Sequence, residues 1–317
     1  MARTAVLGLP RVGPDRELKF ALESYWAGRT GADELTETAA AVRAAGWRRA
    51  RDAGIDVIPA DHSLYDHVLD AAIAVDAIPG RFGGPGAEGL DVLFAMARGG
   101  DGVRPLEMTK WLDTNYHYLV PELADGQRFR ARPEHWLAQM EQARALGIPV
   151  RPVVLGPFSL VRLSKGLTRP LDALAALTPV YAELVAALAA AGAQEVQLDE
   201  PCLALDPDPA EADAARSALT VIAAAAPVAL ATYFAPLDEA VIERLAGIGL
   251  AELHLDLVRG AAQLDAALRA LGGRTTRLSL GVVDGRNVWA ADLDRALAPV
   301  DAATAALGDD RVTIAPS

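Results

Sequence analysis

The sequence of 317 residues predicts an α/β fold, namely a (β/α)8 barrel of the TIM type. Three observations lead to this prediction. Short β-branched runs alternate with longer helical patterns, which is typical of parallel strands joined by helices. Eight such strand runs can be counted, and eight is the number that closes this kind of barrel. The length also fits, because one barrel commonly takes about 250 residues and tolerates insertions.

The first two predicted strands are the run AVLGL at residues 5–9 and the run DVIP at residues 56–59. Further strand runs start near residues 150, 195, 228, 251, 278 and 312. Ser63 is the expected N-cap of the third helix. The segments 156–159 and 199–201 are predicted to be turns. Apolar residues at helical spacing predict the helices, at 16–27, 33–53, 63–76, 134–146, 170–191, 209–225, 237–247, 261–272 and 291–307.

Residues 78–133 interrupt this regularity, and we predict an inserted excursion after the second strand region. It contains Gly- and Pro-rich turns at 80–87, a short helix near 89–97 and an aromatic stretch at 111–118 that suggests a hairpin. The sequence stops just past the eighth strand, so no final helix is expected. We therefore expect a single TIM-barrel domain over residues 1–317 that comes from a longer parent protein.

Composition argues against several classes of protein. Hydrophobic residues make up 52% and charged residues 23%, which is typical of a folded chain with a large core. The net charge of -12 argues against nucleic acid as a partner, because phosphate contacts need a basic surface. The single cysteine, Cys202, argues against disulfides and multi-cysteine zinc sites. No uninterrupted apolar stretch approaches about 18 residues and no signal peptide is recognised, so we expect no membrane span and a cytoplasmic protein.

The loops that follow the predicted strands are polar, and this is the end of a barrel where chemistry is usually found. Two interpretations remain open. The polar residues form a substrate pocket, or they form a charged rim that caps helices and satisfies strand-end amides. The residues concerned are Gly8–Arg11, Asp61 with His62, Gly156–Ser159, Asp199–Pro201, Tyr233 with Phe234, Asp256 and Asp284–Asn287.

Two basic segments are candidate anion sites. Arg11, Arg16 and Lys19 surround a turn and the start of a helix, where free amides attract anions. The alternative is that Glu17 pairs with one of them and the others are solvated. Lys110 lies in a polar and aromatic stretch that either recognises a carboxylate or packs as a hairpin on the barrel.

Other signatures of catalysis are missing from the sequence. The spacing of the five histidines matches no metal-binding motif, and no nucleophile elbow, P-loop or dinucleotide fingerprint occurs. Cys202 has no histidine near it in sequence, so a buried and inert thiol is expected. We expect no metal site in this chain. The histidines are His62, His67, His117, His135 and His254.

Six motifs carry a resemblance to a known family, and they occur in the family's order across nearly the whole chain. The sequence resembles the N-terminal half of cobalamin-independent methionine synthase. The motifs are LGLPRVGPDRELKFALESYW, GIDVIPADHSLYDHVLD, LEMTKWLDTNYHYLVPEL, VQLDEP, GVVDGRNVW and VTIAPS.

This resemblance implies a function. The family is a methyltransferase that moves a methyl group from 5-methyltetrahydropteroyltriglutamate to homocysteine, forming methionine. Its members have two barrels, and the C-terminal barrel holds zinc and most of the homocysteine site. This chain would then be the half without cofactor or catalytic residues, which helps to bind the folate glutamate tail and is inactive without its C-terminal partner. The implied tail-binding residues are Arg16, Glu17, Leu18, Lys19 and Lys110.

The resemblance also has a departure and leaves alternatives. His62 stands where the family usually has Phe, outside the implied contact positions. The LDEP motif is similar to one that handles homocysteine in the other barrel, and in this half we expect Asp199 and Glu200 to be structural remnants. One alternative is a scaffold that only stabilises the catalytic half. The other is a self-sufficient barrel enzyme that uses Asp199 and Glu200 as acid and base.

Overall fold

The computed structural model describes residues 2–100 and 102–317 and contains the predicted barrel. Eight parallel strands follow the order β1-β10-β9-β8-β7-β6-β5-β2. A parallel bridge between Ala5 and Val57 joins the two ends of this order and closes the ring. The strands are β1 (Arg3–Thr4), β2 (Pro59–Ala60), β5 (Arg151–Leu155), β6 (Val196–Asp199), β7 (Val228–Ala231), β8 (Glu252–Asp256), β9 (Arg277–Val283) and β10 (Val312–Pro316).

The first two strands are shorter than predicted and are displaced from their apolar runs. β1 ends just before the run at 5–9, and β2 overlaps only the end of the run at 56–59. Between them, Ala5 pairs with Val57 as an isolated bridge, and the amide of Val6 donates to the carbonyl of Val57 at 3.2 Å. The two apolar runs are therefore paired with each other, but the ladder between them is interrupted.

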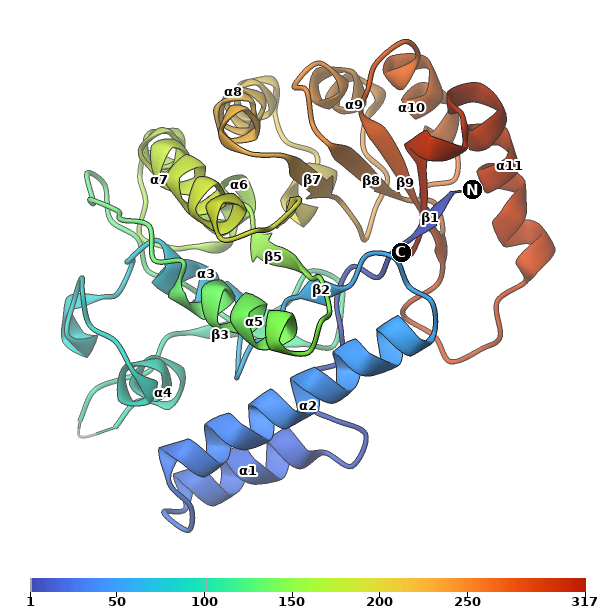
Figure 1. Ribbon diagram of the computed structural model, residues 1–317. Helices are drawn as coiled ribbons and strands as arrows, with labels where there is room; N and C mark the ends of the chain where they lie inside the picture. The colour runs from blue at the N-terminus through green and yellow to red at the C-terminus, as the bar shows by residue number, and fades with distance from the viewer. Residues whose placement is uncertain (1, 101) are drawn as a thin grey trace.

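Helices cover the outside of the barrel, as Figure 1 shows for the arc from α7 to α11. Their apolar sides and the strands form one large hydrophobic cluster, which is the main core. The helices that follow β5 and the later strands are α6 (Pro157–Leu163), α7 (Pro170–Ala190), α8 (Pro209–Ala225), α9 (Glu239–Ala246), α10 (Gln263–Leu271) and α11 (Leu293–Leu307).

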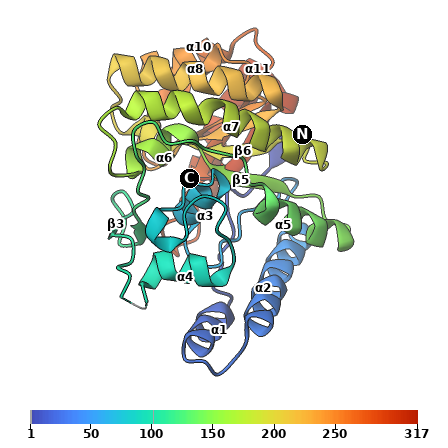
Figure 2. The same ribbon diagram turned by 90° about the vertical axis from the view of Figure 1, so that its left-hand side faces the viewer.

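The first two helices form a hairpin that projects from the barrel. α1 (Glu17–Trp26) packs against α2 (Ala32–Asp52), and both lie away from the strand ring in Figures 1 and 2. Leu18 and Leu22 of α1 belong to a second hydrophobic cluster, which also contains Phe94 and Leu119. This cluster joins the helical hairpin to the inserted segment.

The insertion after β2 includes the predicted β-hairpin. Its strands are antiparallel, and Lys110 pairs with His117. Asp66, and not Ser63 as predicted, caps α3, because its carboxylate accepts hydrogen bonds from the amides of Val68 and Leu69. The same carboxylate accepts from the amide of Leu119, so it also fixes the hairpin to α3. The elements between β2 and β5 are α3 (His67–Ala74), η1 (Gly80–Phe82), α4 (Leu90–Arg98), β3 (Met108–Lys110), β4 (His117–Leu119) and α5 (Glu134–Ala145).

One predicted turn is wrong. Residues 156–159 open the short helix α6 instead, since Pro157 suits a first helical position and Glu200 caps the helix from another strand. The turn at 199–201 leads into η2 (Pro201–Ala204), and η3 (Asp309–Arg311) precedes β10. A cap supplied from a distant strand leaves no local signal, which explains the error.

Helix α7 is long and apolar enough, by length and composition, to cross a membrane. Half of its most apolar window is buried inside the protein. Leu177 and Leu184 are fully buried in the main core, and the hydroxyl of Tyr181 donates to the carbonyl of Leu155 at 2.8 Å. Packing against the barrel and α8 accounts for the apolar composition of this helix.

The barrel interior is polar at its floor, the end where the strands begin. TIM barrels usually fill this space with branched apolar side chains. Here Glu252, only 1% exposed, lies 2.7 Å from Arg3 and 2.8 Å from Arg151. Arg277 pairs with Glu195, which also pairs with Arg3 at 3.1 Å. We call these five residues the floor network.

The charges of the floor network stabilise one another. Burial alone would raise the pKa of Glu252, but Arg151, Arg3 and a hydrogen bond from Thr313 outweigh it and lower the pKa to about 2. This stabilisation is complete above the ordinary glutamate pKa and is lost only as the pH falls toward about 2. The network therefore withstands mild acid.

Glu252→Gln should destabilise the protein strongly, because it removes the buried carboxylate between Arg3 and Arg151 and leaves both arginines to share Glu195 alone. We expect a loss of about 3–5 kcal/mol in the free energy of unfolding, measured by urea titration at neutral pH. The control is Glu239→Gln, which removes an exposed partner of Arg269 and should leave the unfolding midpoint nearly unchanged. Equal losses in the two variants would contradict a structural role for the floor network.

Candidate functional site

The carboxyl ends of the strands form a polar mouth at the other end of the barrel. Asp199 at the end of β6 accepts hydrogen bonds from the hydroxyl of Tyr233 at 3.0 Å and from the side-chain amide of Gln197 at 2.7 Å. Asp61 follows β2 and accepts from the amide of Leu9 at 2.9 Å. Asp61 and Asp199 are each partly exposed as whole residues. The mouth thus presents two carboxylates and a phenol.

These groups have shifted acidities. Burial raises the pKa of Asp61 from 3.8 to about 7, and the negative charge of Asp199 adds to the rise. Burial also raises the pKa of Asp199, against the effect of Gln197 and Tyr233, which hydrogen-bond to its charged form. A carboxyl group that is half-protonated near neutral pH can exchange a proton or hydrogen-bond to a neutral ligand group.

An aromatic wall borders the mouth and combines Trp111 of the inserted segment with rings from α3 and from the end of β7. The ring of Trp111 lies 4.7 Å from that of His67 and 6.4 Å from that of Phe234, between ring centroids. Phe234 also contacts Tyr233 at 4.9 Å. Edge-to-face contacts of this kind hold rings in fixed orientations. The inserted hairpin therefore packs against the end of β7, in agreement with one of the two interpretations of its sequence.

The loop after β9 reaches across to the same hairpin. Arg286 lies 3.0 Å from Asp113 and stacks over Phe234 at 5.4 Å from the ring centroid. Asp284 accepts hydrogen bonds from the amide of Arg286 and the side chain of Asn287, which organises the DGRN turn. An ion pair between the loop after β9 and the inserted hairpin thus lies beside the mouth.

The predicted tail-binding residues on α1 fall into two groups. Leu18 is fully buried, and its amide donates to the carbonyl of Val12, so the side chain packs in the core. Glu17 accepts from the amide of Asp15 at 3.1 Å and so shapes the turn. Arg16, the N-cap residue with φ 62°, and Lys19 are both exposed. Only these two of the four present positive charge to solvent.

Lys19 has a weak partner on its own helix. Its ammonium group lies 3.8 Å from the carboxylate of Glu23, one turn further along α1. Both side chains are about half exposed, so solvent screens this pair and it contributes little to stability. The ammonium group can therefore leave Glu23 for a ligand at small cost.

Lys110 lies on a different element from these cations. It is the last residue of β3, whose three residues are all exposed. In the described part of the chain, no ion pair or shared partner links it to Arg16 or Lys19. Arg11, grouped with these cations from its sequence position, instead donates to the carbonyl of Leu64 at 3.3 Å. Burial lowers the pKa of Arg11, against the opposing effect of the nearby Asp66 and Asp70 carboxylates.

Asp199 and Glu200 do not form an acid–base pair. Glu200 is fully buried, and its two oxygens accept from the amides of Phe158 at 3.0 Å and Ser159 at 2.7 Å. Burial raises the pKa of Glu200 to about 7. Because neighbouring strand residues point to opposite faces, Asp199 faces the barrel interior while Glu200 caps α6. The expectation that Glu200 is structural agrees with this geometry.

Other polar candidates also have structural surroundings. Cys202 is buried as a free thiol, and burial raises its pKa to about 12, so it is a poor nucleophile. Asp256 accepts from the amides of Phe234, Val258 and Arg259 and so orders the loop after β8. Within residues 2–100 and 102–317, no group of three or more His, Cys, Asp or Glu side chains could hold a metal ion.

The strand-end residues could be named from the sequence, but their connections could not. Gln197 bonds to both Arg151 at 2.6 Å and Asp199 at 2.7 Å, so it links the floor network to the mouth. A sequence pattern that indicates this polar interior is a polar residue at every second position of two strands. The residues are Gln197 and Asp199 in one strand and Glu252, His254 and Asp256 in the other. Such alternation predicts one polar face, here the inside of the barrel.

A closed ring of eight parallel strands with a polar carboxyl-end mouth defines a TIM-type barrel protein. A sequence model of the family described as "Cobalamin-independent synthase, N-terminal domain" matches residues 3–308. The chain therefore belongs to this family, and the resemblance found in the motifs is confirmed.

Relatives agree with this assignment. The chain is 46% identical to a 5-methyltetrahydropteroyltriglutamate–homocysteine methyltransferase of Caulobacter vibrioides, over 99% of this chain and 44% of that protein. It is 48% identical to the protein of the same name from Xylella fastidiosa strain M23, over 98% of this chain and 42% of that protein. The chain thus spans less than half the length of these curated relatives.

Solved structures support the fold. A B12-independent methionine synthase from Shewanella sp. W3-18-1, in complex with selenomethionine, superposes with a TM-score of 0.70 at 13% identity, covering 91% of this chain and 82% of that chain. A Listeria monocytogenes structure described as a putative vitamin-B12 independent methionine synthase gives a TM-score of 0.69 at 13% identity, covering 100% and 91%. At this identity the likeness shows the fold alone.

Asp61→Asn should change how stability depends on pH. Asp61 ionises near pH 4 when unfolded but near pH 7 when folded, so the folded wild type holds an extra proton in between. Its stability should therefore fall as the pH rises from about 4 to about 7, by about 2 kcal/mol after allowance for solvent at the mouth. The Asp61→Asn variant should not show this loss. Urea titrations of both proteins at about pH 5 and about pH 8 measure the free energies of unfolding to be compared.

The comparison of variant and wild type isolates Asp61 from the other buried carboxyls. The matched control is Asp15→Asn, a change at an exposed aspartate in the turn before α1. Its stability difference from the wild type should stay the same at both pH values. If the difference between Asp61→Asn and the wild type is also independent of pH, the shifted acidity of the mouth is refuted.

Proposed function

We propose that this chain is the folate-tail-binding half of a methyltransferase that transfers a methyl group from 5-methyltetrahydropteroyltriglutamate to homocysteine. One observation carries the proposal: relatives with this name are 46% identical over 99% of the chain. The chain covers 44% of that relative, so the chemistry is assigned to the two halves together. The working location would be the cytoplasm.

The exposed cations support a role in holding the tail. A triglutamate tail carries several carboxylates along a flexible chain, so its binding needs positive charges at more than one place. Arg16 and Lys19 offer two charges at the first turn of α1, and Lys110 offers a third at the end of β3. The start of a helix adds a partial positive charge to the first pair. Lysine suits this role as a compact point charge.

The turn before α1 is held in a fixed shape. Arg16 takes a left-handed backbone, and a side chain at Gly13 would collide with the carboxylate of Glu17. Backbone strain of this kind costs about 1–3 kcal/mol and recurs at functional sites. The fixed turn keeps the Arg16 and Lys19 side chains in solvent, where a ligand can reach them.

Zinc chemistry belongs to the other half in this proposal. The described residues offer no set of three metal ligands, so they do not fit a zinc ion. Homocysteine would bind through the C-terminal barrel. The chain would contribute binding and position only, and it would be inactive alone.

An exposed apolar surface supports a partner half. Val288 and Trp289 are 91% and 81% exposed, and Leu293 at the start of α11 is 67% exposed. Large neighbouring apolar side chains in solvent are typical of a surface that another protein covers. We assign this surface to the C-terminal barrel of the same enzyme.

Lys19→Ala and Lys110→Ala should each weaken binding of pteroyltriglutamate by about tenfold, the equivalent of one charge-assisted hydrogen bond. Fluorescence titration of the chain measures this, with the monoglutamate form as the ligand that lacks the extra carboxylates. The triglutamate should bind more tightly, and the difference should shrink at high salt.

The matched control is Lys165→Ala, because Lys165 is the third lysine and its ammonium group already pairs with Glu107 at 2.8 Å and Glu122 at 3.6 Å. It should leave the affinity unchanged. If the two folates bind equally, or if Lys19→Ala and Lys110→Ala behave like the control, the tail-binding role fails and the scaffold alternative is favoured.

The isolated chain should form no methionine from homocysteine and 5-methyltetrahydropteroyltriglutamate, even with added zinc. The reason is that its described residues offer no site to hold the metal. Mass spectrometry of the products and metal analysis of the dialysed protein check this. Methionine formation together with one zinc per chain would support the self-sufficient barrel instead.

A further inference from the structure

A cavity of about 300 Å³ lies between α3, the start of α4 and the start of α5. In Figures 1 and 2, α3 and α5 lie next to each other and α4 lies below them. We call this space the helix cavity. Its volume is at the small end of the range for ligand pockets. None of the proposed tail-binding residues lines it, so a ligand here would be independent of the proposed function.

Most of the wall of the helix cavity is apolar. An alkyl or aryl group placed against such a wall releases water from apolar surface, which favours binding. The large apolar side chains that line the cavity come from α3, α4 and the segments beside them, and they are Leu64, Ile73, Ile78, Leu90, Val92 and Leu93.

One corner of the helix cavity is polar and is formed by Asp70 of α3 and His135 of α5. Atoms Oδ2 of Asp70 and Nε2 of His135 lie 3.9 Å apart, so the two side chains converge on one place. The Asp70 side chain is 11% exposed, so its carboxylate can be reached from the cavity that it lines. The charges of Arg11, Asp66 and His67 act on Asp70 from further away.

A buried glutamine keeps His135 from supplying a positive charge to Asp70. The side-chain oxygen of Gln139 accepts from the amide of His62 at 3.2 Å, and its side-chain nitrogen donates to the carbonyl of His62 at 3.2 Å. This pairing fixes the orientation of the side-chain amide, so its nitrogen also donates to Nε2 of His135, at 2.8 Å. A ring nitrogen that accepts a hydrogen bond carries no proton, so His135 is neutral.

The charges around the helix cavity are unequal. Three carboxylates line it, from Asp70, Glu88 and Glu134, against one guanidinium group, from Arg132. Arg132 already pairs with Glu88 at 2.8 Å and with Asp76 at 3.3 Å. Among the described residues, no Lys or Arg forms an ion pair with Asp70 or with Glu134 at the exposed edge. The cavity therefore favours a cation.

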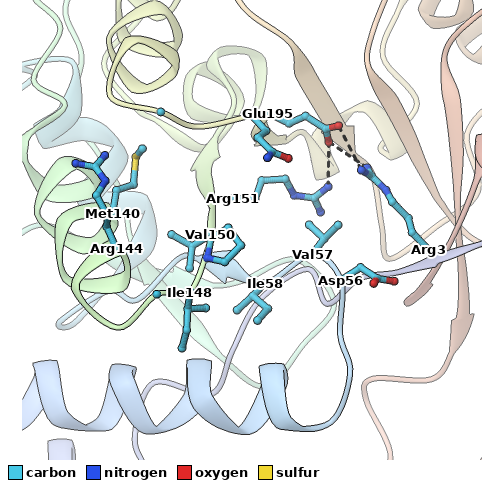
Figure 3. A pocket seen from close by; sticks show the side chains of 14 residues that line it. Arg3, Asp56, Val57, Ile58, Met140, Arg144, Ile148, Val150, Arg151 and Glu195 are labelled. Carbon is cyan, nitrogen blue, oxygen red and sulfur yellow. Dashed lines mark hydrogen bonds and ion pairs between the residues drawn. The ribbon is translucent and has the colours of Figure 1, made fainter.

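The cavity at the floor of the barrel, of about 320 Å³, differs in this respect. Three arginines and two carboxylates line it, and in Figure 3 dashed lines join Glu195 to Arg3 and Arg151. The terminal nitrogens of Arg151 also donate to Glu252 at 2.8 Å and to Gln197 at 2.6 Å. The charged groups at the floor thus satisfy one another.

We propose that the helix cavity binds a small primary amine as its ammonium ion. The ammonium group donates to the carboxylate of Asp70, and the apolar body lies against Ile73 and Leu90. An ammonium group has three N–H donors and no acceptor, which suits a carboxylate that has no cationic partner. The walls favour an organic amine over a metal ion, because apolar side chains offer a metal no ligands.

Benzylamine is the probe for this site, and benzyl alcohol is its neutral counterpart of nearly the same shape. Benzylamine should bind one site per chain with a Kd of about 1 mM, a value expected for a ligand of this size. Benzyl alcohol should bind at least about tenfold more weakly because it lacks the charge. Methylamine should also bind at least about tenfold more weakly, because it lacks the apolar body. Calorimetry and ligand-observed NMR at neutral pH measure all three.

Two substitutions test whether the probe lies in the helix cavity. Asp70→Asn keeps the shape of the side chain but removes its charge, and it should weaken benzylamine binding about tenfold. Ile73→Trp fills the apolar side and should abolish saturable binding. The controls are Asp265→Asn, at the first turn of α10 as Asp70 is at that of α3, and Val221→Trp, at an exposed position on α8. Both controls should bind benzylamine as the wild type does.

Three results would overturn the proposal. Benzylamine and benzyl alcohol could bind equally, which would remove the role of charge, and this comparison needs no variant to fold. Methylamine could bind as tightly as benzylamine, which would remove the role of the apolar wall. Asp70→Asn or Ile73→Trp could bind benzylamine as its control does while remaining folded by circular dichroism, which would place the ligand elsewhere. None of these results bears on the tail-binding residues.

Discussion

The buried ion pairs around Glu252 are the interaction on which the barrel depends. A carboxylate that is 1% exposed is costly to bury, and here Arg3 and Arg151 meet it from β1 and β5 while Thr313 meets it from β10. β1 and β2 have only two residues each in the ladder, so backbone hydrogen bonds hold this part of the ring weakly. Side-chain charges across the interior compensate for the short strands. The barrel is therefore stabilised by ion pairs in its interior as well as by backbone hydrogen bonds between its strands.

The same polar interior gives the barrel two chemically different ends. Gln197 connects Arg151 at the floor to Asp199 at the mouth, so a continuous line of hydrogen bonds follows the barrel axis. At the floor the positive charges outnumber the negative ones around a cavity. At the mouth carboxyl groups with raised pKa values lie beside an aromatic wall. The exposed cations on α1 and β3 lie outside this axis, so charge is segregated into three separate places.

Much of the fold could be predicted from the sequence, because strand and helix patterns are local. The eight strand regions and the main helices are visible as apolar runs and helical spacing, and the inserted hairpin is indicated by an aromatic stretch. The floor network was not, since Arg3, Arg151 and Glu252 are far apart in sequence and each resembles a polar interruption of a strand. Glu200 and Asp199 show the same limit: they are neighbours in the chain, yet one caps α6 and the other faces the barrel interior. The candidate cations were found by motif, whereas the burial of Leu18 depends on a cluster that only the folded chain assembles.

The pairing of β1 with β10 has a consequence for biosynthesis. These are the first and last strands of the barrel in sequence order, and Thr4 lies in register with Ile314. During translation the ring stays open until its last strand has emerged from the ribosome, and until then β1 and β9 each lack a neighbour. Contacts between segments so distant in sequence form slowly, so an unpaired strand edge stays exposed while the rest of the barrel is synthesised. Chaperones that shield strand edges would have their greatest effect during this interval.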